Sequence, residues 1–184
     1  MNYIRTEIKD VWILEPQQFK DSRGYFMETW REEEFNKNIG YDVHFVQDNQ
    51  SKSSYGVLRG LHYQKGELSQ AKLVRVLSGK VLDVAIDLRK ESPTFGKHIA
   101  VELSEENNRQ LFIPRGFAHG FQVLSPTAIF AYKVDNSYAP EAECSILYND
   151  PILNIQWPIM DSEQLILSEK DLQHAVSFQE AEKF

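Results

Sequence analysis

The chain has 184 residues, of which 42% are hydrophobic and 12% aromatic, and its formal net charge is −7. This length and composition predict a single soluble domain over residues 1–184 with a substantial hydrophobic core. The acidic balance argues against binding to nucleic acid or to an anionic membrane, because both require a basic surface. A phosphorylated small molecule is compatible with this charge, since a few local cations suffice to hold it.

The cysteine content and the N-terminal residues bear on the cellular compartment in which the protein is expected. Cys144 is the only cysteine, so an internal disulfide is excluded, and we interpret it as a packed thiol. The N-terminal residues MNYIRTEIKD contain no apolar signal core, and no apolar run approaches the length of a membrane span. Together these features predict a cytoplasmic protein.

The first forty residues predict two strands, a turn and one short helix. Residues 3–15 alternate loosely as a strand, residues 21–24 form a turn, and residues 25–29 form a short strand. Thr29 is a candidate N-cap for a helix over WREEEFNKN, which is acidic in its first turn. Gly40 follows as a typical helix stop.

The next predicted strand, His44–Asn49, presents two amides on one face. Side chains alternate along a strand, so Gln47 and Asn49 point the same way. They either bind the polar edge of a ligand or form an exposed ladder. Residues 56–85 then predict three strands, with Ser78-Gly79 as a hairpin turn between two arms rich in β-branched residues.

Lys72 lies on the apolar face of one of these strands. Alternation along AKLVRV places Lys72 on the same side as Val74 and Val76. A lysine directed at an apolar surface is costly unless it meets an anion or takes part in chemistry. The alternative is a lysine that extends outward at the end of the strand.

The second half of the chain continues the pattern of short strands. Strands are predicted at 97–103, 109–113, 119–124 and 128–135, with turn residues between them. After residue 150 the pattern of short strands breaks, and a helix is predicted to begin at Ser168. Regular short strands predict an all-β sandwich or barrel with one short helix in its N-terminal half and a C-terminal helical cover.

Common catalytic signatures are absent, but one turn is informative. There is no Gly-rich dinucleotide loop, P-loop, serine-nucleophile elbow or zinc-protease motif. The segment 113–120, IPRGFAHG, delivers His119 onto a strand in a way that is similar to the metal site of cupins. Around His62, however, Tyr63 and Gln64 occupy the places of further ligands, which makes a poor metal site. We therefore expect a cupin-type jelly-roll barrel without its metal, whose cavity still binds a ligand.

Two further residues have both a functional and a purely structural interpretation. Tyr132 shares a strand face with Phe130 and Val134, so it either packs in the core or donates a proton inside a dry pocket. Asp171 matches a helix capping box with Ser168, or it supports an imidazole. We expect that a single carboxylate does not perform both tasks well at once.

Five sequence blocks together identify a family. In chain order they are DSRGYFME over residues 21–28, FVQDN over 45–49, GVLRGLHYQ over 56–64, IPRGFAHGF over 113–121 and LSEKD over 167–171. The chain closely resembles the dTDP-4-dehydrorhamnose 3,5-epimerases, metal-free cupins of rhamnose biosynthesis. The match runs over nearly the whole chain, and five blocks in register are far more specific than any single one.

The resemblance implies a role for each matching residue. His62 would be the general base, Tyr132 the general acid on the opposite face of the sugar, and Asp171 the partner of His62. Lys72 would lie against the ketone oxygen of the substrate. The residues that would hold the nucleotide sugar are Arg23, Glu28, Gln47, Asp48, Asn49, Arg59, His119, Glu143 and Lys170, with Phe26 and Tyr138 sandwiching the thymine ring.

The resemblance also implies a homodimer that exchanges its N-terminal strands. Arg23, Phe26 and Glu28 would then serve the site of the neighbouring subunit. A separate difficulty concerns Arg59 and His62, which strict alternation places on opposite faces of their strand. If both contact the substrate, the strand must bulge, and Gly60 is the expected place.

The implied reaction agrees with the chemistry of these side chains. In a 4-keto sugar the hydrogens on C3 and C5 adjoin the carbonyl, and removal of either leaves an enolate whose charge develops on oxygen. A cation is needed there, and inversion needs a base and an acid on opposite faces. No redox cofactor is expected, because the substrate already carries the ketone, and no metal is expected, because ligands are missing around His62.

Three alternatives remain open from the sequence. A single-centre epimerase, acting at C3 or C5 only, would use the same base and acid on a related dTDP-4-keto-deoxysugar. A non-catalytic cupin that binds a nucleotide sugar or glycan predicts that His62→Ala and Tyr132→Phe leave folding and binding intact. A metal-dependent cupin oxygenase predicts a stoichiometric bound metal ion.

Overall fold

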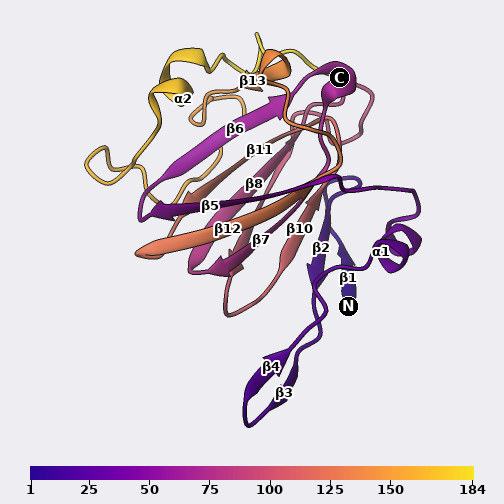
Figure 1. Ribbon diagram of the computed structural model, residues 1–184. Coiled ribbons are helices and arrows are strands. Elements are labelled where there is room, and N and C mark those ends of the chain that lie inside the picture. The colour runs from indigo at the N-terminus through magenta and orange to yellow at the C-terminus, as the bar shows by residue number, and fades with distance from the viewer.

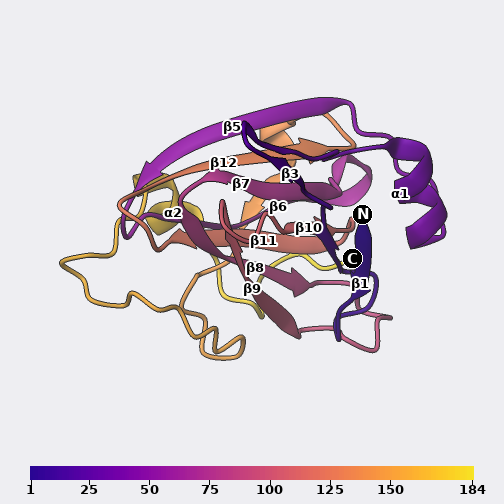
Figure 2. The ribbon, with the colours of Figure 1, turned by 90° about the horizontal axis from the view of Figure 1, so that it is seen from below.

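Two antiparallel β-sheets face each other in the computed structural model, which describes residues 1–184 (Figures 1 and 2). The six-stranded sheet has the order β1-β2-β10-β7-β12-β5, and the five-stranded sheet has the order β13-β6-β11-β8-β9. The first consists of β1 (Asn2–Arg5), β2 (Trp12–Glu15), β5 (Gln47–Ser54), β7 (Lys72–Ser78), β10 (Gln110–Ile113) and β12 (Thr127–Val134). The second consists of β6 (Leu58–Gln64), β8 (Lys80–Asp87), β9 (His98–Ser104), β11 (Phe117–Val123) and β13 (Glu143–Ser145).

The remaining elements lie outside this sandwich. They are the hairpin β3 (Phe19–Asp21) and β4 (Gly24–Phe26), the helices α1 (Glu32–Ile39) and α2 (Glu169–His174), and 3₁₀ turns at Gly66–Leu68 and Pro140–Ala142. The expected jelly-roll barrel with one early helix and a C-terminal cover is therefore confirmed. Neither helix is long and apolar enough to cross a membrane.

The core between the sheets follows from alternation along the strands. Val74 and Val76 of β7 face Val81 and Ala85 of β8, and all four are buried in one cluster with Phe130. This is the side that Lys72 was expected to share, and Lys72 does line the internal cavity at that end of β7. Burial of this apolar surface is the main force holding the sheets together.

Both outer faces of the sandwich are partly covered. The C-terminal segment places Leu153, Trp157 and Phe178 against the outer side of the five-stranded sheet. Helix α1 places Phe35 and Ile39 in a buried cluster on the six-stranded sheet. Figure 1 shows the C-terminal cover beside β6 and α1 at the opposite end, beyond β1 and β2.

The N-terminal region differs from expectation in its details. The single strand expected over residues 3–15 is two strands, β1 and β2, which pair with each other. The N-cap position of α1 is Arg31 rather than Thr29, and no side chain caps it. The carbonyl of Thr29 instead accepts a hydrogen bond from Gln110 Nε2 at 2.8 Å, a contact from a distant strand. Gly40 ends the helix in a left-handed conformation, as predicted.

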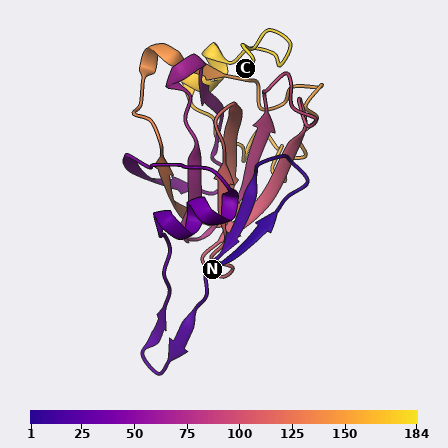
Figure 3. The same ribbon diagram turned by 90° about the vertical axis from the view of Figure 1, so that its right-hand side faces the viewer.

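Two other boundaries are displaced. The strand expected over residues 44–49 begins at Gln47 and runs to Ser54, because β5 pairs with the full length of β12. The short strand expected over residues 25–29 ends at Phe26, within a hairpin that extends away from the sandwich (Figure 3). Its aromatic side chains Phe19, Tyr25 and Phe26 are all exposed.

The predicted irregularity at Gly60 is present. The pairing of β6 with β11 shifts between His119 and Phe121, so that His62 lies opposite His119 and Arg59 opposite Phe121. Gly60 has φ of +133°, and a Cβ there would lie 2.5 Å from Gly120 Cα. Only glycine fits this close approach of two backbones, and the shift brings Arg59 and His62 to the same cavity.

Candidate active site

Two cavities lie within the sandwich and share three residues. One has a volume of about 340 Å³ and the other of about 180 Å³, and His62, Lys72 and Tyr132 line both. The larger is also lined by Gln47, Asn49, Tyr63, Gln64, Gln70, Tyr138 and Glu143. The smaller is also lined by Gln50, Ser51, Arg59, His119, Phe121 and Phe130. Because β6 belongs to one sheet and β12 to the other, His62 and Tyr132 approach this space from opposite sides.

His62 is held by a carboxylate on helix α2. Its Nε2 forms a short hydrogen bond with Asp171 Oδ1, and the Asp171 side chain is almost fully buried. Burial by itself would raise the pKa of Asp171, but hydrogen bonds from His62 and Ser168 lower it below its ordinary value. The carboxylate is therefore ionised at neutral pH and stabilises an imidazolium on His62.

Asp171 also takes part in capping α2, which corrects the expectation that it would not do both. Ser168 Oγ accepts a hydrogen bond from Asp171 N–H at 3.1 Å and donates one to Asp171 Oδ2 at 2.8 Å. The two carboxylate oxygens divide the tasks, with Oδ1 on the imidazole and Oδ2 on the serine. The cap thus orients the carboxylate for His62.

Tyr132 and Lys72 are the other two residues common to both cavities. Burial raises the pKa of Tyr132 above its ordinary value, and the nearby Arg59 opposes this rise. The phenol therefore keeps its proton at neutral pH and can donate it. Burial lowers the pKa of Lys72 to about 8, although Asp83 and Glu143 favour its charged form. The amine of Lys72 is thus still mostly protonated at pH 7.

A cluster at the mouth of the larger cavity links three predicted ligand-binding residues. Glu143 Oε2 accepts hydrogen bonds from Tyr138 Oη and Lys170 Nζ, each at 2.5 Å. Burial would raise the pKa of Glu143, but these two hydrogen bonds lower it. Because Lys170 precedes Asp171 on α2, the same short helix contacts both Glu143 and His62.

Arg59 and His119 complete the smaller cavity. Arg59 Nε donates to Ser53 Oγ at 3.1 Å, which orients its guanidinium from the neighbouring sheet. His119 Nε2 lies 2.9 Å from Asp83 Oδ2, and both side chains are buried. Burial lowers the pKa of His119 despite the neighbouring Asp83. His119 is therefore neutral at pH 7.

Four of the sequence-predicted residues lie away from the two cavities. Asp48 lies on the opposite face of β5 from Gln47 and Asn49, and its carboxylate pairs with Lys133 at 2.6 Å. Arg23 and Phe26 lie on the β3–β4 hairpin, and Glu28 follows it. Arg23 pairs with Asp21 and Glu28 with Arg31 within the same chain.

Asp83 is the main residue that the sequence interpretation missed. A signal was present, because Asp83 lies between Val81 and Ala85 on the inner face of β8, where a carboxylate is unusual. Gln70 also lines the larger cavity, and Gln50 and Ser51 the smaller one. These polar residues have no distinguishing pattern in the sequence.

Two other observations bear on the choice of site. No group of three or more His, Cys, Asp or Glu side chains is placed to hold a metal ion. A cavity of about 640 Å³ lies elsewhere, between Tyr41, Arg89 and Arg115. Its two arginines already pair with Asp10 and Asp135, each at 2.7 Å.

Comparisons with known proteins agree with the resemblance in the sequence. Residues 5–180 match the family described as dTDP-4-dehydrorhamnose 3,5-epimerase. The enzyme of that name from Shigella flexneri is 55% identical over 172 residues, which cover 94% of this chain and 93% of that protein. The crystal structure of the enzyme from Elizabethkingia anophelis superposes with a TM-score of 0.93 at 55% identity, over 97% of each chain.

A third relative was crystallised with a sugar nucleotide. It is the dTDP-6-deoxy-D-glucose-3,5-epimerase of Legionella pneumophila, in complex with dTDP-4-keto-L-rhamnose. Its structure superposes with a TM-score of 0.90 at 51% identity, over 95% of this chain and 92% of that one.

Proposed function

The chain belongs to the dTDP-4-dehydrorhamnose 3,5-epimerase family, and on that premise we propose how its side chains perform the reaction. The protein is an isomerase that epimerises C3 and C5 of dTDP-4-dehydro-6-deoxy-D-glucose to give dTDP-4-dehydro-L-rhamnose. The observation that carries the mechanism is that His62 and Tyr132, on opposite sheets, and Lys72 together line both cavities within the sandwich.

His62 is the base in this mechanism. It removes the proton from the carbon next to the ketone, and the resulting imidazolium is stabilised by the ionised Asp171. The electron pair moves onto the ketone oxygen as an enolate, and the Lys72 ammonium stabilises that negative charge. Tyr132 then donates its phenolic proton to the opposite face of the carbon, which inverts the centre. Before the same steps are repeated at the second of the two centres, C3 and C5, the His62 imidazolium releases its proton to water and the Tyr132 phenolate takes one from water, which restores the base and the acid.

The nucleotide sugar is held at the cavity walls. Arg59 suits the diphosphate, because a guanidinium grips two oxygens at once. Gln47 and Asn49 present amides to polar edges of the ligand, and Tyr138 stacks on thymine at the mouth. His119, Glu143 and Lys170 complete this contact set. A role for Asp48 stays a prediction, since its side chain pairs with Lys133 instead.

The partner subunit completes the site in this proposal. A homodimer that exchanges N-terminal strands would carry Arg23, Phe26 and Glu28 into the neighbouring cavity. The support is that their hairpin extends away from its own sandwich and exposes Phe26. Mixed dimers of Arg23→Ala and His62→Ala chains test the exchange. With exchange, roughly a quarter of the sites contain both intact residues and regain activity; without exchange, none do.

Deuterium incorporation tests the reaction itself. In deuterated water the authentic dTDP-ketosugar should gain two deuterons, one at C3 and one at C5, as read by mass spectrometry and NMR. Incorporation of one deuteron would instead assign a single-centre epimerase. No incorporation with intact binding would favour a non-catalytic sugar-nucleotide binder. Metal analysis of the purified protein tests the oxygenase alternative, for which a stoichiometric ion is required.

A further inference from the structure

Asp83 is a buried carboxylate with an unused oxygen. Its side chain is 0% exposed, and Oδ1 is the buried side-chain atom that has no hydrogen-bond partner. Buried polar atoms are nearly always paired, because leaving one unpaired costs free energy. An unpaired carboxylate oxygen inside the sandwich therefore needs an electrostatic reason for its presence.

The position of Asp83 supplies that reason. It follows Val81 on the inner face of β8, and this face opposes the inner face of β7, which carries Lys72 and Val74. Its other oxygen, Oδ2, contacts His119 Nε2 at 2.9 Å. Asp83 thus lies behind the wall of the smaller cavity, which Lys72 and His119 both line.

The contact between Asp83 and His119 fixes the state of the imidazole. An ionised carboxylate only accepts hydrogen bonds, so Nε2 of His119 carries the proton and donates it to Asp83. Burial lowers the pKa of His119, so the ring is neutral and its Nδ1 keeps a lone pair. His119 therefore offers the cavity an acceptor, which suits a hydroxyl group of a sugar.

The other charged groups around Lys72 are already engaged. Glu143 on β13 accepts from Tyr138 and Lys170, and Asp171 on α2 binds His62 and Ser168. The cations and titratable groups that line the same cavity are Arg59 and His62 on β6, His119 on β11 and Tyr132 on β12. None of these four supplies a negative charge at neutral pH.

We propose that Asp83 is a positioning residue of the epimerase. Its carboxylate is the counter-ion that keeps Lys72 an ammonium inside the cavity, and it fixes His119 as the tautomer that accepts from a sugar hydroxyl. This inference rests on the proposed role of Lys72 in stabilising the enolate. It explains why a carboxylate with a free oxygen lies in an apolar strand.

The direct test is the titration of Lys72 in the full-length protein. Lysine labelled with ¹³C at Cε is followed by NMR against pH, and the Lys72 signal is assigned by its loss in Lys72→Arg. In Asp83→Asn the negative charge is gone, so the pKa of Lys72 should fall by about 1–3 pH units from its starting value near 8. An unchanged titration would overturn the proposal. This readout does not depend on activity.

The pH dependence of turnover is the second readout. The ammonium persists only below the pKa of Lys72, so the alkaline limb of kcat should move to lower pH in Asp83→Asn. Each unit of displacement means about tenfold less ammonium at a fixed pH above both values. KM should change less than kcat, because the charge acts on the enolate. In a Lys72→Arg background the displacement should vanish, since arginine stays charged.

Matched variants separate this role from a structural one. Asp87→Asn alters the other fully buried aspartate of β8, and it should lower the unfolding midpoint while leaving the Lys72 titration unchanged. If Asp83→Asn does not fold, Asp83→Ser removes the same charge and leaves space for water, with the same expected displacement. If the wild type is inactive but Asp83→Asn displaces the Lys72 titration, the proposed function is contradicted and this inference stands. If the wild type is active but Asp83→Asn leaves the Lys72 titration unchanged, the proposed function stands and this inference is overturned.

Discussion

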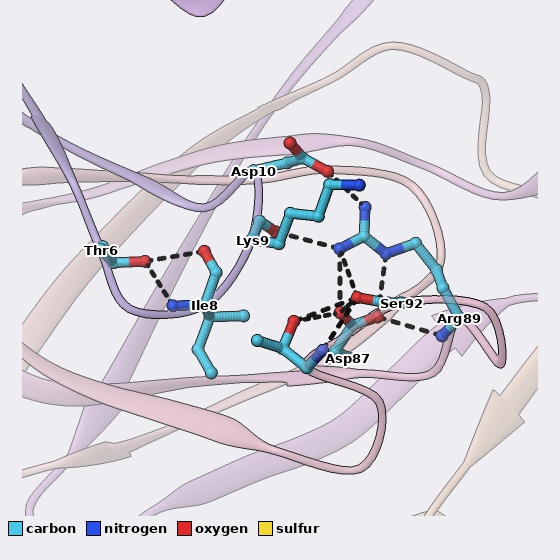
Figure 4. Close-up of polar contacts among 8 residues, drawn as sticks. Thr6, Ile8, Lys9, Asp10, Asp87, Arg89 and Ser92 are labelled. Carbon is cyan, nitrogen blue, oxygen red and sulfur yellow. Dashed lines mark hydrogen bonds and ion pairs between the residues drawn. The ribbon is translucent and has the colours of Figure 1, made fainter.

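Strand β8 buries two aspartates completely, and their surroundings differ. Asp87 Oδ1 accepts from the backbone N–H and Nε of Arg89, while Oδ2 accepts from Arg89 Nη2, Ser92 Oγ and Thr94 Oγ1. Figure 4 shows this group, which we call the Asp87 network, with Asp10 joining through Arg89 at 2.7 Å. Asp83 has one contact, to His119, and one oxygen without a partner.

The difference separates a structural use of a buried charge from a functional one. The Asp87 network fastens the loop after β8 and the N-terminal loop around Asp10, and saturated hydrogen bonds make the buried charge tolerable. On the side of the cavities, Asp83 Oδ1 has no partner, and the cations Arg59 and Lys72 of other strands line the smaller cavity, where they remain available to a substrate. Substitutions in the two regions should therefore have opposite consequences for activity and stability.

The largest effect is expected from the catalytic pair. Tyr132→Phe removes the proton donor and His62→Ala removes the base, so each should lower kcat by about 10²–10⁴-fold. Tyr132→Phe should leave the urea midpoint nearly unchanged, whereas His62→Ala removes the ion-pair partner of the buried Asp171 and should also lower it, so kcat is compared per folded molecule. Turnover of the dTDP-ketosugar and circular dichroism measure the two quantities. The matched control is Tyr41→Phe, which removes a phenol from the cavity beside Arg89 and should keep full activity.

Asp87→Ala should instead lower stability and leave activity unchanged. It leaves Arg89 without its main partner in a largely buried position, so the free energy of unfolding should fall by about 3 kcal/mol, the lower end for a broken buried pair. Asp10 still pairs with Arg89, which limits the loss. Turnover per folded molecule should remain close to wild type. A loss of kcat without a loss of stability would contradict the distinction between the two regions.

The pH dependence of stability sharpens this prediction. Burial would raise the pKa of Asp87, but hydrogen bonds from Arg89, Ser92 and Thr94 lower it below its ordinary value. A depressed pKa contributes stability above the unfolded value of about 3.9, and that contribution is lost as the pH falls through the folded value. The difference between wild type and Asp87→Asn should therefore be largest near pH 7 and shrink below about pH 4. Urea unfolding at both pH values measures it.

The comparison also shows what sequence patterns can and cannot reveal. Alternation predicted that Lys72 lies on the apolar face of its strand and that Gln47 and Asn49 share one face, because strand geometry is local. The conflict between Arg59 and His62 predicted the bulge at Gly60 for the same reason. These inferences needed only the residues of one strand.

Features that depend on distant partners were missed or misjudged. Asp83 carries meaning only through His119, which lies on a strand later in the chain. Thr29 was expected to cap α1, but its carbonyl is held by Gln110 and the neighbouring Trp30 packs on Phe35 at 4.7 Å. Such long-range contacts override local propensity, and no single segment records them.

Gly60→Ala should affect stability and activity together, because Gly60 lies where the backbones of β6 and β11 approach closely beside His62. The added Cβ would lie 2.5 Å from Gly120 Cα and 2.9 Å from the His119 carbonyl oxygen, so β6 and β11 must separate. Overpacking of this kind costs about 1–3 kcal/mol, and His62 should also move relative to His119. Both the urea midpoint and kcat should fall together. Gly66→Ala is the control, because it also has positive φ but meets no atom within 4 Å.

The smallest effect is expected from Ser168→Ala, which removes the N-cap of α2. The loss of a serine cap costs about 1 kcal/mol of helix stability. Helix α2 is short, so the change should appear as local opening, read by hydrogen exchange at residues 169–174, with little change in global unfolding. Because Ser168 also holds Asp171 Oδ2, the carboxylate would lose orientation toward His62 and kcat should fall several-fold. Ser168→Thr keeps the hydroxyl and should restore both readouts. Unchanged kcat with increased hydrogen exchange would mean that Asp171 needs no support from its cap.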